Sequence, residues 1–367
     1  MKKTIALFLF ILLCSSFYSF SPISQSIGPE KPQNIILMIG DGMGLSQITA
    51  GLIAKGNKLE LERCKHVGLI KTFSHKNLIT DSAAAATALA CGRKTYNGAI
   101  SVDPYKQLPL PTILEIAHNK NLATGLVATS YIQHATPACF YAHQDDRNMY
   151  EEITEDLLSG TVDIAIGGGR RFIEEQKDPA AFIKALSELG YEYFTKLKDA
   201  KKMTSGGRAI ILAAEDHLPS ISSGRGSYLS KASEFAIEKL TQIPDKKGFF
   251  LMIEGSQIDW GGHANDKDYI INEVVDFDKT IGEVLDFADE NKNTLVIITA
   301  DHETGGFAIE GGSYENKVVT ADFTTGGHSG TMVPIFAYGP GADLFTGIFD
   351  NTGVFRRMMK AYGFGPM

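Results

Sequence analysis

Short apolar runs alternate with stretches of helical periodicity along most of the chain. The runs contain mainly Ile, Val, Leu and Phe without a polar residue at every second position, at 35–39, 122–129, 162–166, 210–213, 249–253, 294–299 and 333–338. Such runs are typical of strands that are buried on both faces. The helical stretches between them are 111–118, 178–189, 229–240 and 269–291. This order predicts an α/β fold with a mostly parallel central sheet and helices on both faces.

The pattern continues without an internal repeat, a low-complexity segment or a linker-like break. With 367 residues and 44% hydrophobic composition, the chain can bury a large core in one domain or in two smaller ones. Because nothing indicates a boundary, we expect a single large catalytic domain over residues 23–367.

The first 22 residues have a different character. Lys2 and Lys3 precede an apolar run from Ile5 to Cys14, which is too short to span a bilayer. This arrangement is typical of a secretory signal peptide, with cleavage expected between residues 19 and 26. The sequence therefore predicts an exported protein, periplasmic or secreted, without a membrane span.

The net charge of −8 argues against a nucleic-acid partner, because an acidic surface repels the phosphate backbone. It leaves a phosphate substrate open, since bound metal ions can make one cleft positive. The cysteines beyond the signal segment are Cys64, Cys91 and Cys139, and none belongs to a Cys-x-x-Cys pair. We expect buried, inert thiols, at least one of them unpaired, and no thiolate zinc site.

Residues that can bind metal ions follow several of the apolar runs. They are Asp41, His134, Thr136, Glu254, Asp301 and His302. Open α/β sheets bind ligands at the carboxyl ends of their strands, and those ends meet at one edge of the sheet. We therefore expect these side chains to lie together at that edge.

Asp81 and Ser82 precede an alanine-rich stretch that should form a helix. The first turn of a helix attracts anions and favours an alkoxide over a hydroxyl. A Ser or Asp at this place is also an ordinary helix cap. The pair alone leaves both interpretations open.

Three further histidines have both a functional and a structural interpretation. Asp259 and His263 would share one face of a helix and could chelate an ion, but two intervening glycines permit a tight turn instead. His328 lies among glycines, in a loop that exposes either a ligand or an ordinary surface histidine. Asp301-His302 alone would fit a polar loop. Five histidines without such neighbours receive no role: His66, His75, His118, His143 and His217.

Taken together, these residues resemble the alkaline phosphatase family from about Asn34 to Gly339. The resemblance rests on six motifs in the family's order and on Lys94–Gly98 after the serine helix. The motifs are Ile39–Gly44, Thr80–Ala83, His134–Ala138, Glu254 through Asp259 to His263, Thr299–His302 and Gly327-His328. The form is compact and is similar to enzymes of marine and cold-living bacteria.

The resemblance implies an active site with metal ions. One zinc would be held by Asp259, His263 and His328, and a second by Asp41, Asp301 and His302. A third ion, usually magnesium, would be held by Asp41, Thr136 and Glu254.

The resemblance also implies the chemistry. Ser82 would be the nucleophile and form a phosphoserine, while Arg147 grips two phosphate oxygens. Small phosphate monoesters would be hydrolysed at alkaline pH, and the enzyme would be a homodimer.

Two positions depart from the best-known enterobacterial form. His134 and Trp260 stand near the third ion and the phosphate, where that form has Asp and Lys. Histidine is a good zinc ligand, so zinc is also possible at the third site. We expect looser binding of the ion and of phosphate, and faster product release.

Alternatives of related and of different classes remain. A sulfatase is disfavoured, because Ser82 is followed by alanines rather than by the Pro and Arg of that family. A phosphodiesterase of the same fold would usually lack Arg147. A non-catalytic exported protein that binds metal or phosphate would use Ser82 only as a helix cap.

Overall fold

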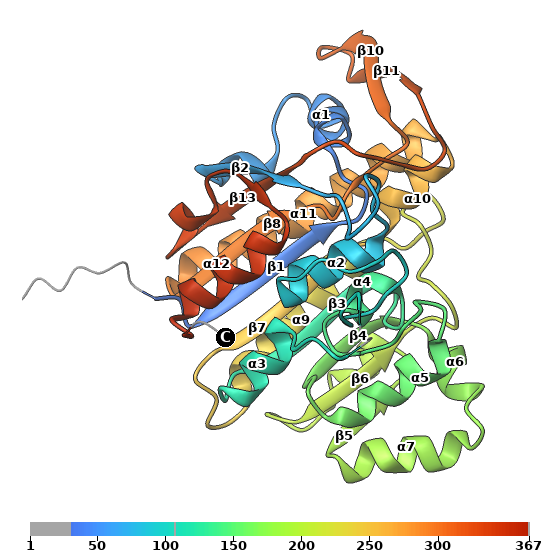
Figure 1. The fold of residues 1–367 in the computed structure, drawn as a ribbon, viewed down its shortest axis with the longest axis vertical. Coiled ribbons are helices and arrows are strands. Elements are labelled where there is room, and N and C mark those ends of the chain that lie inside the picture. Colours follow the sequence, from blue (N-terminus) through green and yellow to red (C-terminus); the bar gives the residue numbers. More distant parts are fainter. Residues whose placement is uncertain (1–30, 106–107, 366–367) are drawn as a thin grey trace, which may run out of the picture.

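A ten-stranded sheet forms the centre of the computed structural model, which describes residues 31–105 and 108–365. The strand order is β14-β2-β13-β8-β1-β7-β3-β4-β6-β5. In Figure 1, α2, α3 and α12 cross the front of the sheet, and α9 and α11 lie behind it. The predicted signal peptide lies outside the described residues. No helix within the described ranges is long and apolar enough to cross a membrane.

The seven predicted runs form the seven adjacent central strands. These strands are β1 (Asn34–Gly40), β3 (Ala123–Tyr131), β4 (Ile164–Gly168), β6 (Arg208–Leu212), β7 (Phe249–Gly255), β8 (Thr294–Thr299) and β13 (Val333–Tyr338). Every residue of β1, β3, β4, β7 and β8 is buried, which explains why their sequences do not alternate. The predicted α/β class and the mostly parallel sheet are confirmed, and β13 runs antiparallel to both of its neighbours.

The strands that the pattern missed lie at the two edges of the large sheet or outside it. The two edge strands are β14 (Gly347–Asp350) and β5 (Tyr191–Phe194), and β2 (His66–Lys71) lies next to β14. The small sheets pair β9 (Glu303–Thr304) with β12 (His328–Ser329) and β10 (Phe307–Ser313) with β11 (Val318–Phe323). Edge strands are partly exposed, so their sequences contain polar residues and do not form apolar runs.

The four predicted helices are present with ends that differ from the prediction by at most two residues. They are α3 (Ile113–Asn119), α7 (Pro179–Glu188), α9 (Tyr228–Gln242) and α11 (Lys267–Asn291). The serine helix is α2 (Ser82–Cys91), and the others are α1 (Leu45–Ala54), α4 (Ala135–Ala138), α5 (Tyr150–Glu155), α6 (Arg170–Glu174), α8 (Leu197–Ala200), α10 (Gln257–His263) and α12 (Thr352–Tyr362). Short 3₁₀ turns occupy Glu60–Arg63, Asp156–Ser159 and Ala342–Phe345. The segment that carries Asp259 and His263 is thus helical despite its two glycines. Cys64, Cys91 and Cys139 are buried, as expected, and all three are free.

The register of three central strands explains where the site forms. β1 lies between β7 and β8, and Ile39 stands opposite both Glu254 and Thr299. Asp41 and Asp301 therefore leave neighbouring strands at the same level. Glu254 lies within the end of β7, one residue before its last, rather than after the strand as the apolar run indicated. The carboxyl ends of β1, β7 and β8 thus bring three acidic side chains to one edge.

Candidate active site

Helix α2 begins at this carboxyl edge with Ser82. Asp81 is its N-cap, and the Asp81 carboxylate accepts a hydrogen bond from the Ala84 N–H at 3.0 Å. All ten residues of the helix are buried, because serine, alanine, threonine and cysteine side chains are small enough for close packing. Since Asp81 caps the helix, the Ser82 hydroxyl is not needed for capping. Its Oγ lies 3.3 Å from His302 Nε2.

Four buried carboxylates lie at the same end of the sheet as this serine. They belong to Asp41, Glu254, Asp259 and Asp301, each at most 4% exposed. Burial and the charge of Asp301 raise the pKa of Asp41 well above its ordinary value. Burial likewise raises the pKa of Glu254 to about 7, and burial together with the charge of Asp259 raises the pKa of Asp301 to about 6. Like charges are thus crowded in a place that water does not reach.

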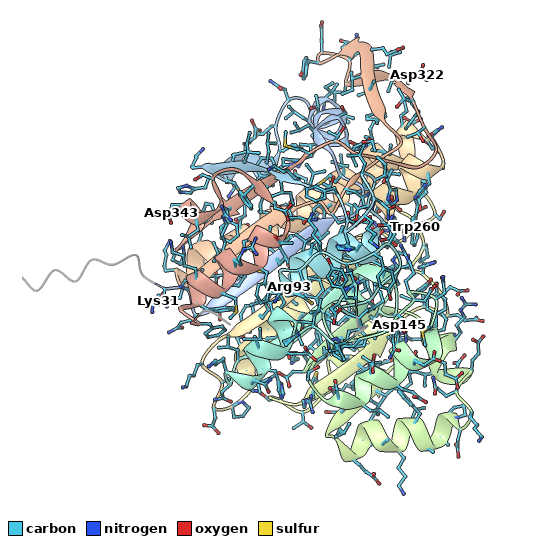
Figure 2. All side chains as sticks on the ribbon, in the orientation of Figure 1. Lys31, Arg93, Asp145, Trp260, Asp322 and Asp343 are labelled. Carbon is cyan, nitrogen blue, oxygen red and sulfur yellow. The ribbon has the colours of Figure 1, made fainter. Side chains whose placement is uncertain are left out.

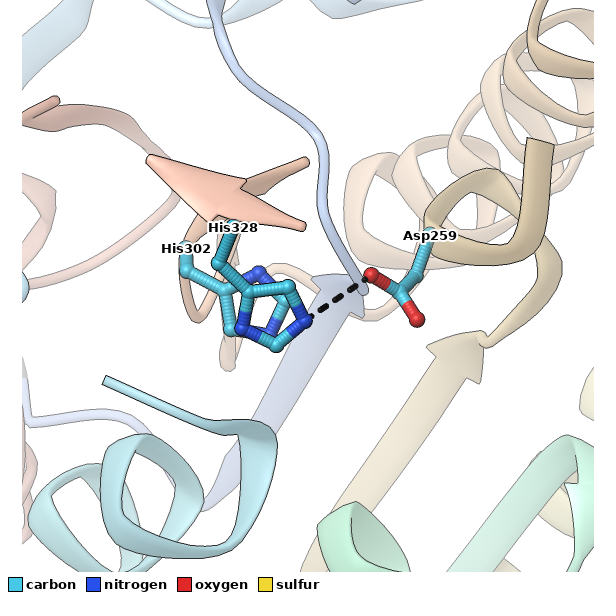
Figure 3. A group of neighbouring side chains, drawn as sticks. All are labelled: Asp259, His302 and His328. Atoms are coloured by element: carbon cyan, nitrogen blue, oxygen red, sulfur yellow. Dashed lines mark ion pairs between the residues drawn. The ribbon is translucent and has the colours of Figure 1, made fainter. Parts of the chain in front are cut away.

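Asp259 differs from the other three carboxylates because histidines face it. His328 Nε2 lies 3.5 Å from Asp259 Oδ1, and His263 Nε2 lies 3.4 Å from Asp259 Oδ2. Burial works to raise the pKa of Asp259, but a hydrogen bond from His328 and the neighbouring imidazoles outweigh it, and the pKa falls below its ordinary value. Figure 3 shows the carboxylate beside the stacked rings of His302 and His328, whose centroids are 3.6 Å apart.

The two histidines opposite Asp259 are oriented by backbone carbonyls. His328 Nδ1 donates to Thr80 O at 2.9 Å, and His263 Nδ1 donates to Gly326 O at 2.8 Å. A carbonyl can only accept, so each Nδ1 carries a proton, and Nε2 is the ring nitrogen that faces the site. The two Nε2 atoms lie 3.2 Å apart. This is the tautomer and orientation of metal-binding histidines.

Three groups of side chains bring potential ligand atoms within 4.8 Å of one another. They are Asp259 with His302 and His328, Asp41 with Asp301 and His302, and Asp41 with His134 and Glu254. His302 thus adjoins two groups, although the sequence assigned it to one. His134 joins the third group directly, where the resemblance made it a neighbour of the ligands.

The donor set fits divalent cations. Several buried atoms in these groups have no hydrogen-bond partner: both oxygens of Asp41, Asp301 Oδ2, Glu254 Oε1, Thr136 Oγ1 and His134 Nδ1. Native proteins rarely leave so many buried polar atoms unsatisfied in one place. Carboxylates and imidazoles suit zinc, and an oxygen-rich set suits magnesium.

Arg147 lies between the serine helix and the third group. Its Nη1 donates to Asp81 Oδ2 at 3.1 Å, and its Nη2 lies 3.3 Å from His134 Nε2. Asp81 Oδ2 also accepts from the Gly98 N–H at 2.9 Å. One carboxylate therefore caps the helix with one oxygen and orients the guanidinium with the other. The sequence singled out Asp81 only as a helix-start residue, because the contact with Arg147 spans 66 positions.

An aromatic cluster forms the side of the site beyond His134. The Trp260 ring lies 6.2 Å from His134 and 4.3 Å from His217, and His217 stacks on Tyr131 at 4.2 Å. His217 therefore lies beside the site although the sequence gave it no role. It lies in a polar loop, and its spacing from the other site residues matches no motif. Its position beside the site is therefore visible only in the folded structure.

The sequence also missed a partner for His143. Its Nε2 lies 2.9 Å from Glu115 Oε1, and its Nδ1 lies 2.9 Å from Ser101 O. This pair belongs to none of the three groups. His66, His75 and His118 also lie outside them.

Comparisons with known proteins agree with this geometry. The profile of the family described as alkaline phosphatase matches residues 32–322. Alkaline phosphatase 3 of Bacillus subtilis (strain 168) is 34% identical over 90% of this chain and 89% of its own length. The solved structure of alkaline phosphatase from the Antarctic bacterium TAB5 is 43% identical and superposes with a TM-score of 0.86, covering 92% of this chain and 100% of that one.

A second solved structure concerns the metal content of the TAB5 enzyme. It is a variant in which a histidine is replaced by aspartate, with Mg bound in the M3 site. It is 41% identical to this chain and superposes with a TM-score of 0.85, covering 92% of this chain and 100% of that one. The resemblance drawn from the sequence motifs, including the likeness to a form from cold-living bacteria, is confirmed.

Proposed function

The chain belongs to the alkaline phosphatase family and is a phosphomonoesterase, and we propose that it acts through a phosphoserine on Ser82. The observation that carries this mechanism is the buried serine whose hydroxyl is free of capping and lies beside unpartnered carboxylates. The Ser82 oxygen attacks the phosphorus in line, a new P–O bond forms, and the bond to the leaving alcohol breaks. Water then attacks the phosphoserine, releases inorganic phosphate and restores the hydroxyl.

Arg147 holds the phosphate during both steps. Its guanidinium can donate two N–H groups to two phosphate oxygens, which a lysine cannot do in a fixed geometry. Asp81 fixes the orientation of Arg147 before substrate arrives, so little side-chain entropy is lost on binding. Recognition stops at the phosphate, and we expect many monoesters to be hydrolysed.

The metal ligands are proposed as the resemblance implied them. Two zinc ions would be held by Asp259, His263 and His328 and by Asp41, Asp301 and His302, and the third ion by Asp41, Thr136 and Glu254 with His134 beside them. When bound, these ions supply the positive charge that favours the ionised serine and stabilises the charge of the phosphate and of the leaving oxygen.

The third site is proposed to accept zinc as well as magnesium. His134 faces Asp41 and Glu254 there, and imidazole is a poor partner for magnesium. The TAB5 variant that holds Mg in its M3 site has aspartate in place of a histidine, which supports this reading. With His134 and Trp260, the site should bind its ion and phosphate loosely and release product quickly.

The decisive test combines activity with covalent trapping. A chromogenic phosphate monoester is offered at alkaline pH to the native protein, to a chelated sample and to samples with zinc and magnesium restored. Acid quenching with labelled phosphate then shows whether a phosphoserine forms, with Ser82→Ala as the control. A metal-loaded protein that binds phosphate without labelling would support the non-catalytic alternative, and faster turnover of a diester would support the phosphodiesterase.

We also propose export, on the basis of the signal pattern in residues 1–22. The measurement is the N-terminal sequence of the protein recovered outside the cytoplasm of its host. A new N-terminus between residues 19 and 26 is expected. Retention of Met1 in the recovered protein would refute the proposal.

Homodimer formation is proposed from the family resemblance and from apolar side chains near the site. Leu78 is 76% exposed, and Ile79 and Met332 are each 38% exposed. A second copy would remove such side chains from water. Sedimentation velocity should show a dimer, and Leu78→Asp should weaken it. A monomer at micromolar concentration would refute this proposal.

A further inference from the structure

A pocket of about 650 Å³ lies at the other end of helix α2 from Ser82. Its walls come from the segment after α2, from α12 and from the described chain near Lys31 and Gly365. Figure 2 labels Lys31 and Arg93 on either side of α12, well away from Trp260 at the active site. The volume is in the range of pockets that bind small organic molecules. We refer to it as the basic pocket.

The name reflects the charges of its lining. Four lining side chains are basic and none is acidic: Lys31, Arg93, Arg356 and Lys360. Within residues 31–105 and 108–365, none of the four forms an ion pair with a carboxylate, and Arg356 donates only to Thr352 Oγ1, at 2.8 Å. Burial and the charge of Arg356 lower the pKa of the neighbouring Arg357 guanidinium. The described residues therefore supply no carboxylate that pairs with this positive charge, in a protein whose net charge is −8.

The remaining lining is largely apolar. Phe355, Met359 and Phe364 form the wall between the basic groups. The Phe364 ring stacks on Tyr362 with centroids 4.9 Å apart, which holds it in place. The chain turns at Gly92 with a φ of +67°, and a Cβ there would lie 2.5 Å from the Phe355 ring, so only glycine allows this close approach.

We propose that the basic pocket binds an organic anion that joins an acid group to an apolar body. Phosphate, sulfonate and carboxylate groups all suit the guanidinium groups of Arg93 and Arg356. An inorganic ion would leave the aromatic wall uncovered, and a neutral apolar molecule would take the charges out of water without pairing them. A lining that is both basic and apolar therefore favours a ligand that has an acid group and an apolar body.

This site is independent of the catalytic one and does not rest on the proposed mechanism. Ser82 and Cys91 are the first and last residues of the ten-residue helix α2, which is about 15 Å long. The ligand of the basic pocket should therefore not compete with phosphate.

The test uses the fluorescent anion 8-anilinonaphthalene-1-sulfonate as the probe, with the metal-loaded full chain. Inorganic phosphate is kept at saturating concentration to fill the catalytic site. The dye is expected to bind the native protein, and the charge-reversing variant R93E/K360E should bind it at least about tenfold more weakly. The matched control K201E/K202E carries the same change of net charge on two exposed lysines elsewhere and should bind like the native protein.

Two further variants exclude misfolding as the cause of weaker binding, and they test the basic and the apolar side chains of the pocket separately. R93Q/K360Q removes the charges without reversing them and should give a smaller loss of affinity. Phe364→Ala should weaken the dye but not a small sulfonate without an aromatic body. All variants are checked for unchanged hydrolysis of a phosphate monoester, since none touches the catalytic groups.

Three results would overturn the proposal. Equal dye affinity in R93E/K360E and K201E/K202E would show that the basic side chains do not bind the anion. Displacement of the dye by phosphate would place it in the catalytic site. Dye binding that occurs only in a chain ending at Gly365 would assign the pocket to the chain's own last residues.

Discussion

Buried carboxylates at the two ends of the parallel sheet differ in how they are satisfied. At the amino end, Asp163 precedes β4, and its oxygens accept from Arg208 Nε at 3.0 Å and from the Thr124 N–H at 2.9 Å. At the carboxyl end, both oxygens of Asp41 and one of Asp301 have no hydrogen-bond partner, and the nearest ring nitrogen, His302 Nε2, lies 3.4 Å from Asp41 Oδ1 and 3.2 Å from Asp301 Oδ2. Burial is nearly complete in both places. The difference lies in the partners.

The comparison teaches how to distinguish buried charge that stabilises the fold from buried charge that awaits a ligand. Asp163 has its cation and its backbone donor within the chain, so removing it breaks a completed set of contacts. The carboxyl-edge groups repel one another, and this repulsion opposes folding until cations bind. Each of the following predictions changes one side of this contrast.

Asp41→Asn should have the largest effect, with opposite signs on activity and on stability. The activity at alkaline pH should fall by about 10³-fold or more, because the proposed role of Asp41 as a ligand shared by two ions would be lost together with its charge. The chelated protein should become more stable, since the folded-state pKa of Asp41 is raised, and an ionised group with a raised pKa opposes folding at neutral pH and above. Urea unfolding of chelated samples measures this, and a less stable chelated variant would contradict it.

Asp163→Asn should show the reverse behaviour. Arg208 would keep its charge beside a neutral amide, and we expect a loss of about 2–3 kcal/mol in the free energy of unfolding. Monoester hydrolysis at low temperature should stay within about twofold, because Asp163 lies at the other end of the strands. The measurement is urea unfolding with metals bound, beside a rate assay. A loss of activity without a loss of stability would contradict the view that Asp163 stabilises the fold and takes no part in hydrolysis.

The double substitution H134D/W260K tests the groups at the carboxyl end of the sheet and should have a moderate effect. A third carboxylate and a new ammonium group beside the third site should strengthen magnesium and phosphate binding, each by about tenfold. Product inhibition by phosphate during monoester hydrolysis provides the readout. The looser-site hypothesis is wrong if the inhibition constant for phosphate does not fall.

The sequence patterns predicted which acidic residues lie at the ends of the buried strands. They did not predict contacts between residues that are far apart in the sequence. The seven buried strands and the acidic residues after them were visible because apolar runs need no partner information. Strands near an edge of the sheet, such as β2, were not visible, because most of the β2 residues are partly or fully exposed. The metal-ligand roles came from a family resemblance and await the experiments above. Contacts such as His217 with Trp260 and Asp81 with Arg147 join distant positions, and no local pattern encodes them.

The pair of His143 and Glu115 belongs to neither group of carboxylates compared above, and changing it should have the smallest effect. It tests whether the contribution of a paired histidine to the free energy of unfolding falls as the pH rises. Burial lowers the pKa of His143, but the hydrogen bond that its ring donates to the Glu115 carboxylate and the charge of Glu115 outweigh burial and raise the pKa. Burial raises the pKa of Glu115, but His143 outweighs it and lowers that pKa. The histidine contribution is present below its unfolded pKa of about 6.5 and is lost as pH rises through the folded value, whereas the glutamate contribution is lost only in acid.

His143→Gln should therefore destabilise the protein more at pH 6 than at pH 9, because the charged imidazole contributes most at the lower pH. Both side chains are about four-fifths buried, so we expect a difference of about 1 kcal/mol at most between the two values of ΔΔG. Urea unfolding at both pH values, with Glu115→Gln as the matched control, measures it. An equal cost at pH 6 and pH 9 would mean that the hydrogen bonds of His143, and not its charge, provide the stability, and that this pair resembles Asp163 only in geometry.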